Sequence, residues 1–373
     1  MRVTHASLHL VRLPLVHRFR TSSHAKDHLD HILVRLTDES GAVGWGEIAS
    51  ASDPYYSPET ADTCWLVAQR YLLPAVAGVR WDDPAEVAGL WANVRGHQFA
   101  KAGVDIAAWA LWSLSGGVSL ATALGGTRAT VTAGVSLGIE PTIGDLLAEV
   151  TKHVEAGYPR AKLKIAPGWD VEPVRAVRAA FPDLLLHVDA NGAYGESEDE
   201  VRALRSLDEH GLTMIEQPFA PRNLLAHAAL QRDISTPVCL DESIDTLDDL
   251  RTAVVLGALR VLNIKVSRLG GLGPAVAAHD LAAEHDIPVW CGGMHEFGVG
   301  RAANVALSSL PGFTLPSDVS ASDKYYERDV VTPPVTAAGG VVTVPTAPGL
   351  GHEVDEEFIA SVTVRSAEIA ADS

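Results

Sequence analysis

The stretch AKLKIAPGWD, residues 161–170, contains two lysines two positions apart in a segment that otherwise predicts a buried strand. In a strand, side chains at positions i and i+2 point to the same side, so Lys162 and Lys164 enter one environment. A buried ammonium group needs an anionic partner or loses its proton. The stretch therefore predicts that acidic side chains lie close to both lysines.

Strand-like runs recur from residue 130 onward, each followed by a helical stretch rich in Ala, Leu, Glu and Arg. The eight runs read VTAGVSLG, AKLKIA, LLLHVDAN, TMIEQP, PVCLDES, RVLNIKVS, PVWCGG and FTLPSD. Five charged residues near the ends of these runs are spaced by about 25 residues, the length of one strand-helix unit; they are Lys164, Asp189, Glu216, Asp241 and Lys265. Eight such runs predict an α/β protein with a (β/α)7β TIM-like barrel, whose functional residues lie at the carboxyl ends of the strands.

The first 125 residues follow a different pattern. The stretch HILVRLTDESGAVGWGE, residues 31–47, reads as a hairpin with a glycine turn, and residues 58–114 read as mainly helical. We therefore predict an α+β capping domain over residues 1–125 and a catalytic barrel over residues 126–324. The tail from about residue 325 contains GGVVTVPTAPGLG and is expected to fold back onto the capping domain, so that residues 325–373 complete it.

The amino-acid composition argues against some classes of binding partner. The 373 residues are 47% hydrophobic and carry a formal net charge of -18, which disfavours nucleic acids and anionic membranes because both present negative phosphate groups. The sequence has no evident signal peptide or membrane-spanning run, so the cytoplasm is the expected location. The cysteines have no C-x-x-C spacing and are predicted to be free, buried side chains; they are Cys64, Cys239 and Cys291.

Three carboxylates, Asp189, Glu216 and Asp241, end three consecutive predicted strands. They are therefore expected side by side at the mouth of the barrel, where like charges do not all stay ionised without a counter-ion. Oxygen ligands with open coordination positions suit Mg²⁺ or Mn²⁺. The alternative is that each acid forms an ion pair with a neighbouring Lys or Arg, which explains three acids in phase less well.

The lysines at the strand ends gain a role beside such a metal ion. Lys164 ends the strand before the three acidic ones and Lys265 ends the strand after them, so their ammonium groups are expected to flank the ion. Burial and a nearby dication lower the pKa of a lysine toward the range in which it removes protons. Arg268 would act in the same direction if it points inward. The alternative for Lys265 is an ion pair with Asp241 or Glu242.

Several motifs together resemble one family. They are KLKI, VDAN, IEQP, LDES, NIKVSRLGG and WCGGMHEFGVGRAANVALSSLPGFTLPSD, with GWGE and FRTSS in the first domain. The chain resembles, over nearly its whole length, the muconate-lactonizing branch of the enolase superfamily, and most closely its o-succinylbenzoate synthase and N-acylamino acid racemase group. The resemblance implies Mg²⁺-dependent removal of the proton alpha to a substrate carboxylate through an ene-diolate, a pattern known for this superfamily.

The resemblance also implies roles for individual residues. It makes Asp189, Glu216 and Asp241 the metal ligands, and Lys164 and Lys265 the acid/base catalysts. Lys162 would stabilise the charge that develops on the substrate carboxylate. Residues expected to contact the substrate or to support the site are Ser136, Asn191, Glu242, Arg268, Gly292, Gly293, Met294, His24 and Phe297.

Loops that would cap the barrel depart from the family pattern. RTSSHAKD has Ser23 and His24 where a Phe-Gly pair is common, and Phe297 stands where a small residue is usual. The remaining unusual residues are His97, Gln98 and Phe99 in GHQFAKAG, together with His295. The histidines are candidates for reading a polar or anionic acyl group. Tyr55 and Tyr56 are expected to pack in the core, and Trp290 is the tryptophan expected near the site.

These differences leave the expected reaction class unchanged, but they do not identify the substrate. The expected activity is racemisation of N-acylamino acids such as N-succinylamino acids, syn-dehydration to o-succinylbenzoate, or both. A muconate-type cycloisomerase, or a racemase or epimerase of another carboxylate, is the alternative within the superfamily. A Schiff-base aldolase does not need three acids around its lysine, and a non-catalytic barrel would lack bases or ligands. The resemblance also implies a homo-oligomer that acts on a small carboxylate.

Overall fold

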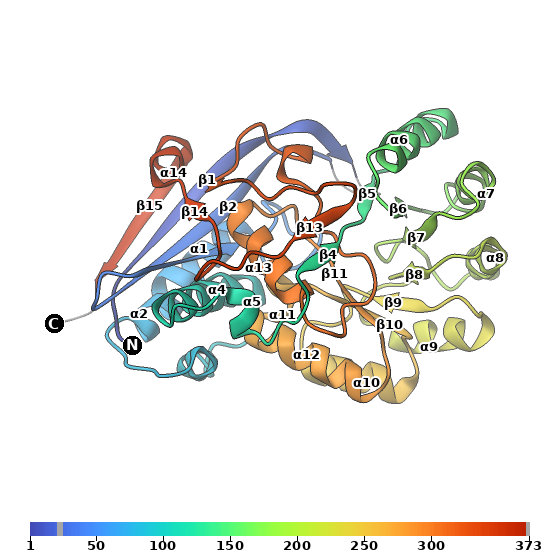
Figure 1. Ribbon diagram of the computed structural model, residues 1–373. Coiled ribbons are helices and arrows are strands. Elements are labelled where there is room, and N and C mark those ends of the chain that lie inside the picture. Colours follow the sequence, from blue (N-terminus) through green and yellow to red (C-terminus); the bar gives the residue numbers. More distant parts are fainter. Residues whose placement is uncertain (21–24, 371–373) are drawn as a thin grey trace.

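The structure, a computed structural model, describes residues 1–20 and 25–370. Figure 1 shows an antiparallel sheet, formed by both ends of the chain, beside a parallel sheet surrounded by helices. The parallel sheet follows the chain order of its seven strands. They are β5 (Val135–Leu137), β6 (Arg160–Lys164), β7 (Leu185–Asp189), β8 (Met214–Glu216), β9 (Val238–Leu240), β10 (Val261–Ile264) and β11 (Val289–Cys291).

The eighth predicted run, FTLPSD, closes the ring without forming a regular strand. It makes single parallel bridges from Phe313 to Val289 and from Ser317 to Ala133. Pro316 within the run has no N–H with which to extend a ladder. The predicted TIM-like barrel is confirmed, but its eighth strand is reduced to these bridges.

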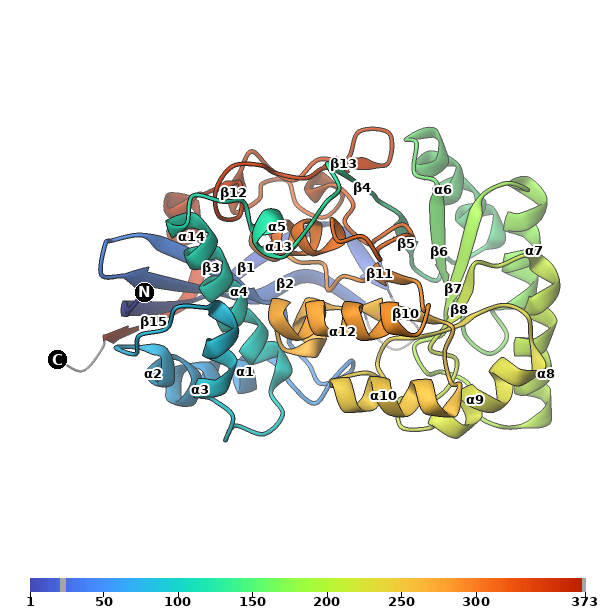
Figure 2. The ribbon, with the colours of Figure 1, turned by 60° about the horizontal axis from the view of Figure 1, so that its bottom comes forward.

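Helices cover the outside of the parallel sheet, as expected of strand-helix repeats (Figure 2). Thr142, Ser197 and Thr246 cap three of them by accepting hydrogen bonds from N–H groups of the first turn. The helices are α6 (Ile143–Glu155), α7 (Val171–Ala180), α8 (Glu198–Ser206), α9 (Leu224–Asp233), α10 (Leu247–Leu256), the short α11 (Val266–Leu269), α12 (Leu272–Glu284) and α13 (Gly298–Ser308). Turns of 3-10 helix cover Leu207–His210 and Ser322–Lys324.

The antiparallel sheet has the strand order β15, β1, β2, β3. Its strands are β1 (Val3–Arg20), β2 (Ala25–Asp38), β3 (Val43–Ile48) and β15 (Thr363–Ala370). The predicted hairpin is present, since β2 and β3 pair from Ile32 and Ile48 to Thr37 and Val43. The predicted helical region is divided into α1 (Ala61–Val67), a π-helical turn (Ala68–Leu72), α2 (Leu73–Val76), a 3-10 turn (Pro84–Glu86), α3 (Val87–Leu90) and α4 (Gln98–Ser115).

The GWGE motif allows α4 to lie directly against β3. A Cβ atom on Gly46 would lie 1.9 Å from the carbonyl oxygen of Gly103 in α4. A Cβ atom on Gly103 would in turn lie 2.2 Å from Ile48 Cγ1. Both positions therefore need glycine, because any side chain would separate the helix from the sheet.

The strands of the tail belong to three different sheets: β15 to the antiparallel sheet, and the others to two sheets of two strands each. Within GGVVTVPTAPGLG, β13 (Val341–Thr343) pairs with β4 (Thr130–Thr132) rather than with the capping sheet, because Gly340 turns the chain there and its carbonyl accepts a hydrogen bond from Ala133 at 2.8 Å. β15 is the part of the tail that pairs with β1, and the assignment of residues 325–373 to the capping domain stays a prediction. Other short elements are α5 (Leu120–Ala123), β12 (Val331–Thr332), β14 (Glu353–Val354) and α14 (Glu356–Val362). The limits at residues 125 and 325 stay predictions.

Two buried carboxylates attach the capping elements to barrel helices. Glu47, at the end of GWGE, accepts hydrogen bonds from the N–H groups of Phe297 at 2.8 Å and Gly300 at 2.7 Å, at the start of α13. Asp105 in α4 accepts one from the N–H of Leu272 at 2.6 Å, at the start of α12. The first N–H groups of a helix have no partner within the helix, so a side-chain oxygen placed there satisfies them. These contacts hold the capping elements in a fixed position beside the barrel.

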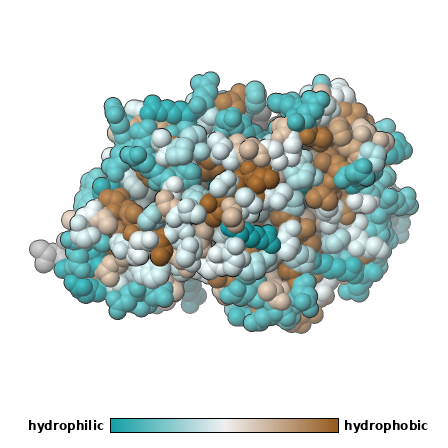
Figure 3. Space-filling view, viewed as in Figure 1, coloured by the Kyte–Doolittle hydropathy of each residue, from teal (hydrophilic) through white to brown (hydrophobic). Residues whose placement is uncertain are grey.

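The surface is mixed in character. Figure 3 shows hydrophilic residues along most of the outline of one face, with apolar residues in small groups between them. Across residues 1–20 and 25–370, no helix has the length and apolar character needed to cross a lipid bilayer. The three cysteines are buried and free, as predicted.

Candidate active site

The strand register brings the predicted charged residues together. Lys164 on β6 pairs with Asp189 on β7, which pairs with Glu216 on β8. Paired residues of parallel strands point to the same side of the sheet. Lys162 is two positions before Lys164 and therefore points to that side as well. Glu216 pairs with Cys239 on β9, and Asp241, two positions further along, also points to that side. These side chains therefore converge at the carboxyl ends of the strands.

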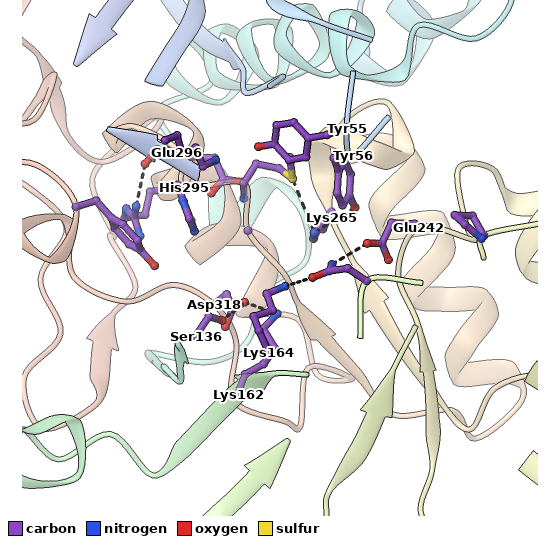
Figure 4. A pocket seen from close by; sticks show the side chains of 17 residues that line it. Tyr55, Tyr56, Ser136, Lys162, Lys164, Glu242, Lys265, His295, Glu296 and Asp318 are labelled. Carbon is purple, nitrogen blue, oxygen red and sulfur yellow. Dashed lines mark hydrogen bonds and ion pairs between the residues drawn. The ribbon is translucent and has the colours of Figure 1, made fainter. Parts of the chain in front are cut away.

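A cavity of about 200 Å³ lies between these strand ends and the capping elements. Figure 4 shows Lys162 and Lys164 on one side of the cavity and Tyr55 and Tyr56 on the other. Tyr55 and Tyr56 come from the segment after β3, and Lys26 comes from β2. The cavity thus has a floor from the barrel and a roof from the first 125 residues.

Lys162 lies among carboxylates on this floor. The distances from its Nζ are 3.0 Å to Asp318 Oδ2, 3.2 Å to Glu216 Oε2 and 3.6 Å to Asp189 Oδ2. Burial would lower the pKa of Lys162, but these carboxylates outweigh burial and raise the pKa above its ordinary value. The ammonium also lies 4.7 Å from the centre of the Trp290 ring, a favourable cation-π contact. Lys162 therefore remains positively charged.

Lys164 begins a chain of hydrogen bonds at the cavity wall. Its Nζ donates to Asp189 Oδ2 at 2.5 Å and to Asn191 Oδ1 at 2.6 Å. Asn191 Nδ2 donates in turn to Glu242 Oε1 at 2.8 Å (Figure 4). Burial, followed by the charges of Asp241 and Asp189, raises the pKa of Glu242 to about 8. Asn191 and Glu242 thus both line the cavity and connect to Lys164.

Lys265, directly after β10, enters the cavity from the far side of the acids. Its Nζ forms an ion pair with Asp241 Oδ2 at 2.8 Å and donates to the Tyr56 hydroxyl at 3.1 Å. Burial would lower the pKa of Lys265, but Asp241 and Tyr56 outweigh burial and raise it well above its ordinary value. The predicted lowering, which assumed a nearby dication, stays a prediction, and the ion pair considered as the alternative is present.

Arg268 points inward but lies beneath the cavity. Its guanidinium donates to the Asp241 carboxylate and to the carbonyl groups of Ile244 at 2.7 Å and Asn263 at 2.6 Å. Burial would raise the pKa of Asp241, but Lys265 and Arg268 outweigh burial and lower it. Arg268 therefore supports Asp241 and is not part of the cavity lining.

The three acids are held by cations of the chain. Within the part of the chain that the structure describes, no three Asp, Glu, His or Cys side chains are arranged to hold a metal ion. The donor chemistry nevertheless fits a hard cation. Two of the buried carboxylate oxygens without a hydrogen bond in the described chain lie at this site: Glu242 Oε2, and Asp241 Oδ2, whose ion pair with Lys265 lacks hydrogen-bond geometry. Burial and the nearby charge of Glu216 raise the pKa of Asp189, and a divalent cation would relieve this repulsion.

The other predicted substrate contacts divide into two groups. Ser136, Gly293 and Met294 line the cavity, and the Ser136 hydroxyl donates to Asp318 Oδ2 at 3.0 Å. Gly292 lies behind them, because a Cβ atom there would lie 2.3 Å from Asn263 Oδ1. Gly292 is thus required for backbone packing rather than for contact with a ligand.

Phe297 also lies away from the cavity. Its ring is fully buried, with its centre 4.7 Å from that of His31 and 5.2 Å from that of Tyr326. We therefore correct its predicted contact with the substrate, since the ring fills the core between the two domains. The unusual residue after the MHE motif changes packing and not the cavity wall.

The histidines predicted to read an acyl group have different positions. His24 and Ser23 lie outside the described residues. His97 and Phe99 do not line the cavity, and Phe99 is buried. His295 does line it and stacks on Tyr325, with ring centres 4.8 Å apart. Burial, followed by the charge of Lys26, lowers the pKa of His295 well below its ordinary value, so its ring stays neutral.

Several cavity residues were missed or misread in the sequence, among them Tyr56, Asp318 and Lys26. Tyr56 was expected in the core, but its hydroxyl donates to Asp241 Oδ1 at 2.6 Å. Asp318, in the last strand-like run, accepts hydrogen bonds from Arg160 at 2.8 Å and from Ser136. Its position at the end of FTLPSD matches that of the other charged strand ends and was an available signal. Lys26 follows no pattern that marks it as a cavity residue.

Comparison with known proteins agrees with this geometry. Residues 5–125 match the mandelate racemase / muconate lactonizing enzyme N-terminal domain, and residues 145–358 match the enolase C-terminal domain-like family. The chain is 45% identical to an o-succinylbenzoate synthase of Geobacillus kaustophilus, over 97% of this chain and 96% of that protein. It is 45% identical to an N-succinylamino acid racemase of an Amycolatopsis species, over 97% of this chain and 98% of that protein.

A solved structure extends this comparison to the fold. An enolase superfamily member from Listeria innocua has a TM-score of 0.96 and 37% sequence identity, with both chains covered completely. The matched families together span both the capping elements and the barrel. The chain therefore belongs to the enolase superfamily, with the N-terminal domain of the mandelate racemase and muconate lactonizing enzymes followed by an enolase C-terminal domain-like barrel.

Proposed function

We propose that this protein removes the proton alpha to a substrate carboxylate, and that it thereby racemises N-acylamino acids, N-succinylamino acids in particular, forms o-succinylbenzoate by syn-dehydration, or does both. One observation carries the proposal: Lys164 at the end of β6 and Lys265 directly after β10 reach a single cavity, and three strands, β7, β8 and β9, lie between β6 and β10. Lys162 lies on the floor of the same cavity. The two activities are those named for relatives 45% identical to this chain.

The chemistry follows from the two lysines on different walls. A neutral lysine takes the alpha proton from one face of the substrate, and the ammonium group of the other returns a proton to the opposite face, which inverts the carbon. Syn-dehydration instead needs a single lysine, because the proton and the hydroxyl group leave from one face. In either reaction, negative charge develops on the substrate carboxylate, where the ammonium group of Lys162 stabilises it.

We further propose Mg²⁺ or Mn²⁺ as the cofactor, with Asp189, Glu216 and Asp241 as ligands. When bound, the ion would supply positive charge that makes the alpha proton more acidic. An ion at Asp241 would compete with Lys265 for that carboxylate, and so weaken the ion pair that raises the pKa of Lys265. The carboxylates that now hold the lysines are thus the ones expected to exchange them for a metal ion.

The test is an NMR assay of the Mg²⁺-loaded protein in D₂O. N-succinyl-L-alanine should exchange its alpha proton for deuterium and yield the D-enantiomer, and the precursor of o-succinylbenzoate, assayed in parallel, measures dehydration. Absence of both exchange and dehydration would contradict the proposal. Lactonisation of a muconate without alpha exchange of the N-acyl substrate would favour the cycloisomerase alternative.

A further inference from the structure

Lys26 is the cation of the cavity that comes from the capping sheet. It lies on β2, is half-buried and is one of the residues that line the cavity. Its ammonium group forms no ion pair or hydrogen bond with any residue in the ranges 1–20 and 25–370. Lys26 is therefore a positive group that faces the cavity without an anionic partner from the described chain.

The three barrel lysines differ from Lys26 in this respect. The shortest distances from their ammonium groups to a carboxylate oxygen are 3.0 Å for Lys162, 2.5 Å for Lys164 and 2.8 Å for Lys265. The acid that acts most on Lys26 is Glu296, but its Oε1 already accepts a hydrogen bond from the N–H of Met294 at 2.9 Å. The barrel lysines are neutralised within the site, whereas Lys26 is not.

An anion bound beside Lys26 would be stabilised by the positive charge of Lys26, which forms no ion pair with the described chain. Burial, followed by the charge of Lys265, lowers the pKa of Lys26 to about 8, and the opposing charge of Glu296 does not outweigh them. A buried charge without a partner is costly, and a ligand carboxylate would offset that cost with a charge-assisted hydrogen bond. Lys26 thus has the properties of an anion-binding residue that the capping sheet supplies to the cavity.

The chemistry of the relatives' substrates contains such an anion. The names o-succinylbenzoate synthase and N-succinylamino acid racemase share a succinyl group, which ends in a carboxylate remote from the reacting carbon. Building on the proposed function, which assigns the alpha carboxylate to the floor with Lys162, we propose that Lys26 binds the distal carboxylate of the substrate's acyl group. Lys26 would then select dicarboxylate substrates over substrates with a neutral acyl group.

The experiment compares two substrates that differ only in this group, N-succinyl-L-alanine and N-acetyl-L-alanine. Replacement of Lys26 by Met should lower the ratio of their kcat/KM values by about 10- to 100-fold, the effect of losing a hydrogen bond to a charged group. The loss should fall mainly on KM for the N-succinyl substrate. Lys26→Arg should restore most of the ratio, and Lys152→Met, which removes an exposed lysine of α6, is the matched control.

Other outcomes overturn the inference. An unchanged ratio, or equal losses on both substrates, would show that Lys26 does not read the distal carboxylate. Calorimetric titration of the Mg²⁺-loaded protein with the same two compounds tests binding apart from turnover. If the wild-type protein turns over neither compound, the proposed racemisation of N-acylamino acids is contradicted for these substrates. The inference then stands only if the wild type binds the N-succinyl compound more tightly than the N-acetyl one and Lys26→Met removes that difference.

Discussion

The Tyr56 hydroxyl donates a hydrogen bond to Asp241 Oδ1 over 2.6 Å, and the centre of its ring lies 4.4 Å from the ammonium group of Lys265. Tyr56 precedes the helices of the capping region, whereas Asp241 and Lys265 belong to the barrel. Burial and the charge of Asp241 raise the pKa of Tyr56 well above its ordinary value, so the hydroxyl keeps its proton and remains a donor. The capping region thus helps to orient an acid of the site.

Tyr56→Phe tests this contact because it removes the hydroxyl and keeps the ring. We expect the free energy of unfolding to fall by about 1–3 kcal/mol, since a buried carboxylate oxygen loses one of its donors and keeps that from Arg268. Turnover should fall as well, because Asp241 and Lys265 lose a shared partner. Urea denaturation and steady-state kinetics measure the two effects. Tyr71→Phe, at a ring that is 56% exposed, is the control, and equal behaviour of the two variants would contradict an orienting role.

Lys164→Met and Lys265→Met are expected to show which lysine acts on which face of the substrate. Each variant should racemise about 10²- to 10⁴-fold more slowly than the wild type, because one face loses its proton donor or acceptor. Each should still exchange the alpha proton of one enantiomer in D₂O, and the two variants should retain opposite enantiomers. NMR of both enantiomers measures this, while Mg²⁺ titration checks that the metal site remains. Near-normal racemisation by either variant would contradict the two-base scheme.

Addition of Mg²⁺ to protein treated with EDTA is expected to raise Tm as well as activity. A ligand that binds only the folded state at about 100 times its Kd contributes about 2.7 kcal/mol to stability. Asp189→Asn should lose most of this shift, whereas Asp199→Asn, an acid on α8 whose side chain is 89% exposed, should keep it. Differential scanning calorimetry measures the shift without relying on turnover. A Tm that does not respond to Mg²⁺ in the wild type would argue against the proposed ligands.

The barrel and its charged strand ends were accessible from sequence because they follow from a repeat. Once strands recur about every 25 residues in a parallel ring, register alone brings Lys164, Asp189 and Glu216 to one edge. The contact of Tyr56 with Asp241 spans 185 positions and depends on how the capping region packs, which no local pattern encodes. Lys26 belongs to the same class, since its place in the cavity follows from the position of β2 against the barrel.

The direction of the pKa shifts was the property of the site that was hardest to predict from the sequence. Whether the pKa of Lys265 is raised or lowered depends on which groups it contacts, Asp241 first and then Tyr56, and the residue types alone permit either direction. The prediction of a regular eighth strand at FTLPSD failed because it too depended on contacts that composition does not show. FTLPSD has the composition of a strand, but Pro316 interrupts its pairing, so Asp318 reaches Lys162 from a loop.

Asp105 predicts a pH dependence of stability that lies outside the active site. Its side chain is 1% exposed, and burial raises its pKa to about 7 even though the N–H groups of Leu272 and Gly273 favour the charged form. The folded state therefore holds this proton to a higher pH than the unfolded chain, in which the pKa of Asp is about 3.9. The contribution of Asp105 to stability is thus fully present below about pH 4 and is lost as the pH rises through about 7.

Asp105→Asn should remove this dependence, because the amide does not titrate and its oxygen can still accept the hydrogen bond from Leu272. Between pH 4 and 7, the stability of the wild type should fall relative to that of the variant by about 1.4 kcal/mol per pH unit, the slope for one proton. Urea denaturation at several pH values measures both curves, and the difference in slope is independent of any constant cost of the substitution. Asp248→Asn, at a side chain 89% exposed, should leave the wild-type slope unchanged. Parallel curves for the wild type and Asp105→Asn would mean that Asp105 is already ionised in the folded state at low pH, with the N–H groups at the start of α12 outweighing its burial.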